Sequence, residues 1–257
     1  MRTNPLKEKL ARGETQIGSW VYMVRNPAIL QLMKSAGLDF AQVDIEHSSP
    51  SMDDIGHMAL LSRALDFPIV VRPPEGNREW ITRLLDSGVW CLRVPQVDNP
   101  DIAREVVQAS RYAPDGLRGM SGIGPHTDYE TGPVGETQRF LNEQVHITVM
   151  FESQEAFDHI DEIVGMPGID GVTLGPSDLA QELGVFGTPD QAGVIDEYRN
   201  RLLEAAERHG KDASFLVQSP EQARQWIGRG VKLICYSSEV DVLRRAYVTA
   251  VGEITTS

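Results

Sequence analysis

The stretch that decides the fold is residues 147–184, ITVMFESQEAFDHIDEIVGMPGIDGVTLGPSDLAQELG. It contains two short apolar runs, at 147–152 and 171–175, and longer segments of mixed polarity follow them. A nearly continuous apolar run is typical of a parallel strand that is covered on both faces. The stretch therefore predicts consecutive strand–helix units of a parallel α/β protein.

The same unit extends over the rest of the chain in both directions. Further strand candidates are residues 17–22, 40–45, 68–72, 89–94, 213–217 and 231–236. Between them, helix starts are indicated by Asn26-Pro27, Asn99-Pro100, Ser219-Pro220 and the capping-box pair Ser51 and Asp54. Eight such units in 257 residues predict one (β/α)8 TIM-barrel domain spanning residues 1–257. A doubly wound open sheet is the alternative, although the first strand lacks the glycine fingerprint of a dinucleotide site.

Two segments depart from this rhythm. Residues 112–145 are rich in glycine and proline and show little periodicity, so we expect an irregular loop near the active site. Residues 238–256 predict a C-terminal helix.

Composition limits the classes of function. The 37 Asp and Glu residues against 24 Lys and Arg residues give a net charge of −13, which argues against nucleic-acid and membrane partners. The polar N-terminus lacks a secretory signal and no apolar run is long enough for a membrane helix, so we expect a cytoplasmic protein. The two cysteines, Cys91 and Cys235, lie within strand patterns and are expected in the core.

Polar side chains follow several predicted strands at the ends where barrel enzymes place their active sites. They are Asp44, Glu46, His47, Arg72, Glu152 and the turn Gly175-Pro176-Ser177-Asp178. Glu152 and Asp178 would either hold a hard divalent cation or face solvent. Arg72 would either stabilise an enolate or form an ion pair with Asp44 or Glu46. His126, in the irregular loop, is a weaker candidate for substrate contact.

His47 and the turn at residues 175–178 each suggest a further role. Asp44 lies three residues before His47, so its carboxylate is placed to orient the imidazole and make it a base, although a surface histidine has the same pattern. The backbone N–H groups of the turn are suited to a carboxylate or a phosphate.

Several stretches together resemble the HpcH/HpaI aldolase family, which are metal-dependent class II pyruvate aldolases related to 2-keto-3-deoxy sugar acid aldolases. They are DIEH (44–47), PIVVRPPEG (68–76), residues 84–107, RYAPDGLRG (111–119) and residues 151–184. The resemblance covers roughly residues 15–250 and implies a (β/α)8 barrel and a hexameric or trimeric assembly that the C-terminal helix helps to form.

The resemblance also implies roles for particular residues. Glu152 and Asp178 would bind Mg²⁺, Mn²⁺ or Co²⁺, and His47 paired with Asp44 would be the base, acting through water. Arg72 would stabilise the enolate of pyruvate, or of a related 2-oxoacid, before it attacks an aldehyde. The turn at Gly175, with the N–H groups of Ser177 and Asp178, would hold the substrate carboxylate. Asp86 and Glu46 would support the His47 network.

Two departures leave the substrate open. Met150 stands where the family commonly has glutamine, on the same strand face as Glu152, and it cannot donate a hydrogen bond. The segment 121–132 also differs from the family, which often has an arginine there. The alternatives are a CoA-thioester lyase of the citrate-lyase β-subunit type and an oxo-acid-binding protein that has lost the catalytic step.

Overall fold

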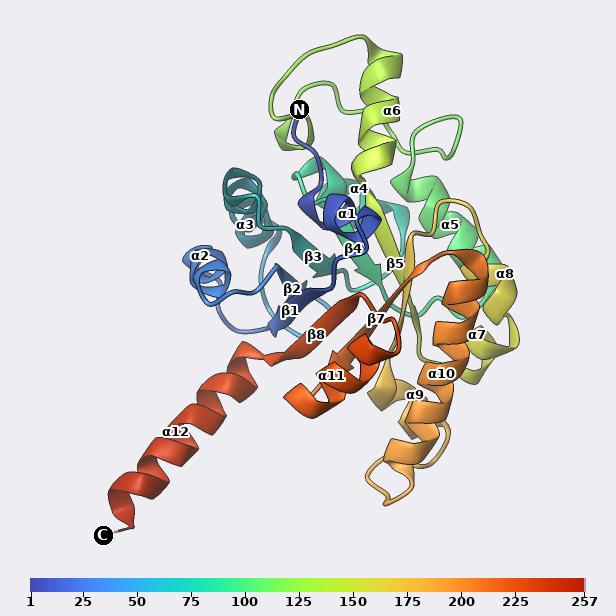
Figure 1. The fold of residues 1–257 in the computed structure, drawn as a ribbon. Coiled ribbons are helices and arrows are strands. Elements are labelled where there is room, and N and C mark those ends of the chain that lie inside the picture. Colours follow the sequence, from blue (N-terminus) through green and yellow to red (C-terminus); the bar gives the residue numbers. More distant parts are fainter. Residues whose placement is uncertain (257) are drawn as a thin grey trace.

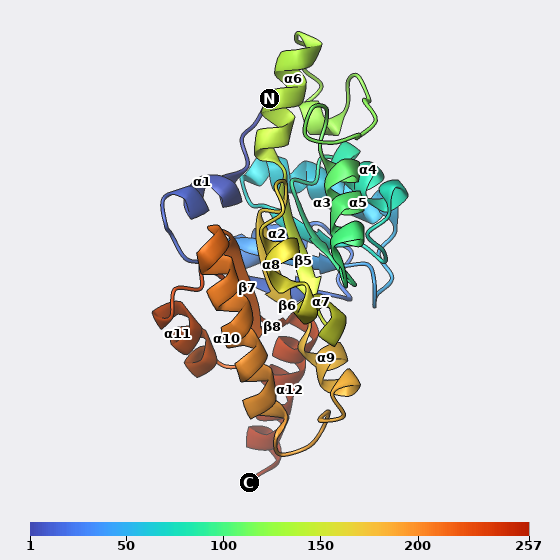
Figure 2. The same ribbon diagram turned by 90° about the vertical axis from the view of Figure 1, so that its right-hand side faces the viewer.

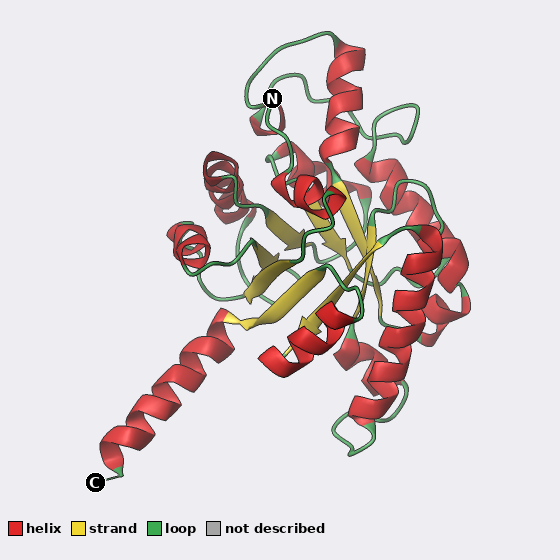
Figure 3. Ribbon diagram, in the orientation of Figure 1, coloured by secondary structure: helices red, strands yellow, loops and turns green. Residues whose placement is uncertain are grey.

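Eight parallel strands close into a barrel in chain order, β1 to β8, in a computed structural model that describes residues 1–256 (Figures 1 and 3). The strands are β1 Gln16–Val21, β2 Phe40–Asp44, β3 Ile69–Arg72, β4 Cys91–Val94, β5 His146–Phe151, β6 Gly171–Leu174, β7 Asp212–Val217 and β8 Leu233–Ser238. The predicted (β/α)8 barrel is confirmed, and each strand begins and ends within two residues of its expected place.

Helices surround this barrel because the outward faces of the strands are apolar, and the helices cover these faces and exclude water from them. They are α1 Pro5–Ala11, α2 Ala28–Ser35, α3 Met52–Leu65, α4 Arg78–Asp86, α5 Pro100–Ser110, α6 Val134–Gln144, α7 Gln154–Asp158, α8 Ile160–Val164, α9 Pro176–Glu182, α10 Gln191–His209, α11 Pro220–Gly228 and α12 Glu239–Thr255. The outward strand residues Val43, Val71 and Ile147 are buried in the main core against these helices.

The expected helix starts are largely confirmed. Asn99 and Ser219 cap α5 and α11 through their side-chain oxygens, and Ser51 with Asp54 forms the capping box of α3. The start at Asn26-Pro27 differs by one residue, since α2 begins at Ala28.

The N-terminal helix α1 closes the bottom of the barrel, the end from which the strands start. Its Leu6 side chain is 1% exposed and packs with residues of the first layer inside the barrel, Phe40, Val70, Trp90, Cys91 and Leu233. The sequence analysis did not predict this helix, because it has only seven residues and only one of its side chains is buried. Cys91 and Cys235 are both buried, as expected.

The predicted irregular loop at 112–145 is only partly irregular, and it leads from α5 to the start of β5, so within this chain it lies at the end where the strands start and not near the active site as expected. A short 3₁₀ turn, η1 Pro125–Thr127, lies within it, and α6 occupies its last third. The expectation was wrong for α6 because that helix follows Pro133 directly and carries few apolar residues: only Thr137, Leu141 and Asn142 are buried.

The C-terminal helix is confirmed as α12, which projects away from the barrel (Figure 1). The two termini lie at opposite ends of the molecule in both views (Figures 1 and 2). Among residues 1–256, no helix is both long and apolar enough to cross a membrane.

Candidate active site

A cavity of about 200 Å³ lies where the strands end and the loops that follow them begin. Its lining residues come from seven of the eight strands, β1 to β7, or from the turns after them. They are Trp20, Tyr22, His47, Arg72, Arg93, Met150, Leu174, Gly175, Pro176, Ser177, Asp178 and Leu216. In a (β/α)8 barrel this end carries the active site, so the cavity has the position expected of a catalytic centre.

Arg72 is fixed by two carboxylates from the neighbouring strand. Its Nε donates to Asp44 Oδ1 at 3.0 Å and its Nη2 donates to Asp44 Oδ2 at 2.6 Å. Its Nη1 lies 3.1 Å from Glu46 Oε2. Register explains the pairing, because Asp44 is directly opposite Arg72 between β2 and β3. The structure therefore contains the ion pairs that the sequence analysis left open, and they hold the guanidinium in one orientation beside the cavity.

The His47 imidazole does not pair with the Asp44 side chain, in contrast to the expectation; only the His47 backbone N–H donates to Asp44 Oδ1, at 3.5 Å. Both Asp44 oxygens already accept from Arg72, and the backbone N–H of Glu46 donates to Oδ1 at 2.9 Å. His47 Nε2 instead lies 3.4 Å from Glu46 Oε2, and the imidazole is 59% exposed. Glu46, rather than Asp44, is therefore the carboxylate within ion-pair distance of the imidazole, and its Oε2 forms no hydrogen bond within residues 1–256.

Glu152 extends from the end of β5 and is nearly buried, at 7% exposed. Its Oε1 accepts the backbone N–H of Gln96 at 2.6 Å. Burial raises the pKa of this carboxyl to about 7, and the nearby charges of Glu46 and Asp178 act in the same direction. The Glu152 side chain lies close to the turn after β6, and this closeness requires glycine at position 175, since a Cβ there would lie 2.4 Å from Glu152 Oε2.

The turn after β6 has the strand-to-helix form that the sequence predicted. Gly175 is the N-cap residue of α9, and no side chain caps that helix. Asp178 lies in its first turn and faces the cavity together with Ser177. The first backbone N–H groups of α9 are thus left without a side-chain acceptor at the cavity.

Two residues expected near the substrate lie outside the cavity of their own chain. Asp86 is the last residue of α4, at the opposite end of the barrel, and accepts from Arg118 Nη2 at 2.6 Å. His126 is buried beside this pair, and burial lowers its pKa. The predicted order of elements already implied this position, because Asp86 comes just before the strand expected at 89–94 and a helix between two parallel strands ends where the next strand starts.

Arg93 lines the cavity and was not singled out by the sequence analysis. It lies within β4, and inside a strand only the alternation of side chains decides whether a residue faces the barrel interior or the helices. Its neighbours Leu92 and Val94 belong to the outer core, so Arg93 points inward. The alternation of side chains along this strand could therefore have indicated from the sequence that Arg93 faces the barrel interior.

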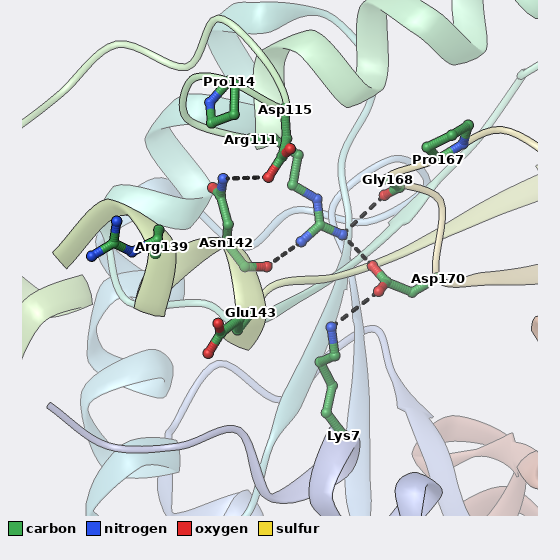
Figure 4. A pocket seen from close by; sticks show the side chains of 10 residues that line it. All are labelled: Lys7, Arg111, Pro114, Asp115, Arg139, Asn142, Glu143, Pro167, Gly168 and Asp170. Atoms are coloured by element: carbon green, nitrogen blue, oxygen red, sulfur yellow. Dashed lines mark hydrogen bonds and ion pairs between the residues drawn. The ribbon is translucent and has the colours of Figure 1, made fainter. Parts of the chain in front are cut away.

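Larger hollows exist elsewhere on the molecule. One of about 580 Å³ lies near the start of β6, and Figure 4 shows that Lys7, Arg111 and Asp170 contact one another there, whereas Arg139 and Glu143 are drawn without a contact. Asp170 accepts from Lys7 Nζ at 3.0 Å and also pairs with Arg111, which in addition donates to the backbone oxygen of Asn142. This network ties the N-terminal helix to the barrel and is structural.

Fold and site together define a TIM-barrel enzyme whose acidic and cationic groups converge at the carboxyl ends of the strands. The sequence profile of the family described as HpcH/HpaI aldolase/citrate lyase matches residues 16–246. The chain therefore belongs to this family, and the protein is an enzyme of the aldolase and lyase type.

Particular relatives agree with this assignment. The chain is 34% identical over 250 residues to a 2-keto-3-deoxy-L-rhamnonate aldolase of Escherichia coli O17:K52:H18, covering 93% of this chain and 91% of the relative. The crystal structure of an HpcH/HpaI aldolase from Desulfitobacterium hafniense DCB-2 has a TM-score of 0.93 at 29% identity, covering 98% of this chain and 97% of that one. An HpcH/HpaI aldolase/citrate lyase family protein from Burkholderia cenocepacia J2315 has a TM-score of 0.87 at 29% identity, covering 99% and 100%.

Proposed function

We propose that the protein is a divalent-metal-dependent class II aldolase that forms or cleaves 4-hydroxy-2-oxoacids from pyruvate, or a related 2-oxoacid, and an aldehyde. One observation carries the proposal: Asp178 and a fixed guanidinium, Arg72, line the same cavity, and Glu152 borders it at Gly175. A 2-oxoacid needs this combination, because its carbonyl must be polarised and its enolate must be stabilised.

Glu152 and Asp178 suit a hard cation such as Mg²⁺, Mn²⁺ or Co²⁺. Glu152 uses one oxygen for the Gln96 N–H, while no hydrogen bond within residues 1–256 reaches Oε2. Nearby Glu46 and Asp178 repel its negative charge, and a cation between the acids would relieve this repulsion. No group of three or more His, Cys, Asp or Glu side chains in the described chain is arranged to hold a metal. Two carboxylates would thus leave the remaining positions to water and substrate.

A bound divalent cation would polarise the ketone of the 2-oxoacid and make its C3 proton more acidic. In this scheme the His47 imidazole, oriented by Glu46, removes that proton. Arg72, held by Asp44, places positive charge beside the developing enolate oxygen. The first N–H groups of α9, at Ser177 and Asp178, hold the substrate carboxylate.

The test is exchange of the pyruvate C3 protons with deuterated water, followed by NMR. We expect exchange that requires added Mg²⁺ or Mn²⁺ and stops with EDTA, and a loss of at least about 100-fold in Asp178→Asn and Glu152→Gln. Asp101→Asn is the matched control, because Asp101 is an exposed acid of α5 that does not line the cavity. Full exchange in EDTA, or in Asp178→Asn, would show that the metal assignment is wrong.

The same assay separates the other activities considered for this chain. Binding of pyruvate without any proton exchange would indicate an oxo-acid-binding protein, and cleavage of a CoA thioester would indicate the citrate-lyase type. The relative named 2-keto-3-deoxy-L-rhamnonate aldolase makes 2-keto-3-deoxy sugar acids the first compounds to test for cleavage.

We also propose that α12 packs against a second copy of this chain. Its apolar side chains are exposed, at 42% for Leu243, 68% for Tyr247 and 76% for Ile254. Together with Val240 and Val251 they recur every three or four residues, so they form one stripe along the helix. Because α12 projects from the barrel, its own chain does not cover this stripe (Figure 1), and a homo-oligomer would bury it.

A further inference from the structure

Arg93 is a buried cation without an acidic partner. Its side chain belongs to a residue that is 2% exposed, and none of the ion pairs within residues 1–256 includes it. Its Nη2 donates to Ser214 Oγ at 2.6 Å, while its Nε is buried and has no hydrogen-bond acceptor. Burial lowers the pKa of this guanidinium to about 10, and the positive charge of Arg72 acts in the same direction. A charge in this position is costly unless an anion joins it.

Arg72, in the same cavity, is an example of a guanidinium that is paired with carboxylates. Its charge is matched by Asp44 and Glu46, whereas Arg93 has one neutral hydroxyl. Both guanidinium carbons lie over the Trp20 ring, at 4.6 Å for Arg72 and 5.7 Å for Arg93. The cavity therefore contains one guanidinium that is paired with carboxylates and one that has no carboxylate partner among residues 1–256, and both lie over the same aromatic ring.

The position of Arg93 connects it to the reacting end of the substrate. In the β4–β5 pair Arg93 is opposite Thr148, and Met150 lies two residues further along the same face of β5. Met150 lines the cavity and cannot donate a hydrogen bond, whereas Arg93 can; the Trp20 Nε1–H beside it also has no acceptor within residues 1–256.

We infer that Arg93 binds a second carboxylate of the substrate, in addition to the carboxylate of the 2-oxoacid, and thereby determines specificity. A guanidinium recognises a carboxylate through paired N–H groups, and Arg93 has N–H groups to spare. The second carboxylate belongs either to a 2-oxodicarboxylate donor or to an acidic aldehyde. This inference rests on the proposed function only for the identity of the first carboxylate.

The donor is tested by calorimetry with lactate and malate, two unreactive acids that differ by one carboxylate. Measurements in EDTA make the result independent of the metal and of aldol chemistry. Wild-type protein should prefer malate, and Arg93→Met should reduce the malate-to-lactate affinity ratio by about 10- to 100-fold. Arg104→Met, which changes an exposed arginine of α5, is the matched control and should leave the ratio unchanged.

The aldehyde is tested by comparing kcat/KM for glyoxylate and for glycolaldehyde with pyruvate as donor. A fall in the glyoxylate preference of Arg93→Met, with the malate ratio unchanged, assigns the second carboxylate to the aldehyde. If neither ratio falls, the inference is wrong whether or not the protein proves to be an aldolase. If Arg93→Met does not fold, Arg93→Lys replaces it; lysine keeps the charge but loses the planar fork, so a smaller loss of the same ratio is expected.

Discussion

Asp44 and Arg72 form a bidentate ion pair between neighbouring strands at the mouth of the barrel, with N–O distances of 3.0 and 2.6 Å. Both residues are buried. This pair determines the other contacts of the site. Both Asp44 oxygens accept from Arg72, so the acid near the His47 imidazole is Glu46.

Replacing Asp44 by asparagine tests the importance of this pair. We expect Asp44→Asn to lower the free energy of unfolding by about 3–5 kcal/mol, because it leaves a buried guanidinium short of one partner. Urea unfolding followed by circular dichroism measures the change. Asp101→Asn removes an exposed acid from an ion pair and should cost less than about 1 kcal/mol. Equal losses in the two variants would contradict the structural role of the Asp44 pair.

Metal affinity should depend on pH through Glu152. In the metal-free fold the Glu152 carboxyl has a pKa of about 7, above the ordinary value of 4.5. Protonation of Glu152 therefore stabilises the metal-free fold. This contribution to stability is complete below pH 4.5 and is lost as the pH rises through 7. A divalent cation binds the carboxylate, so its affinity should rise about tenfold per pH unit below 7 and level off above. Calorimetric titration with Mn²⁺ from about pH 5.5 to about pH 8.5 measures this. A rise of the same slope in Glu152→Gln would show that another group is responsible.

Gly175→Ala should damage the site without unfolding the protein. The new Cβ would lie 2.4 Å from Glu152 Oε2 and 2.7 Å from Glu152 Cβ, so the carboxylate must turn away and the ends of β5 and β6 must shift apart. We expect Mn²⁺ affinity to fall at least about tenfold, together with a lower urea midpoint for a protein that still folds. Gly193→Ala is the matched control, because a Cβ there meets nothing within 4 Å and the position lies in α10. Unchanged Mn²⁺ affinity in Gly175→Ala would argue against Glu152 as a ligand.

Charge on the exposed stripe of α12 should disrupt the assembly. The double change Tyr247→Asp and Val251→Asp places two carboxylates on the stripe, which we expect to lower the molecular mass measured by light scattering. Thr249→Asp adds a charge to the other side of the helix and serves as the control. A monomeric wild-type protein would contradict the proposed packing of α12.

The sequence by itself determined the barrel and the strand ends that carry polar groups. Strand runs such as 40–45 and 147–152 are local patterns of burial, and Ser51, Asn99 and Ser219 are local caps. Such patterns depend on residues only a few positions apart in the sequence, so they can be recognised without knowledge of the tertiary structure.

Only the tertiary structure decided the partners within the site. The pairing of Asp44 with Arg72 depends on the register of two strands separated by a helix, and the pairing of Asp86 with Arg118 joins α4 to a loop that follows α5. The partners of Arg93 likewise depend on the fold. Strand β7 places Ser214 beside its guanidinium, and no acid within residues 1–256 pairs with it. Ion pairing is a matter of a few ångströms across the barrel, and sequence separation carries no information about such distances.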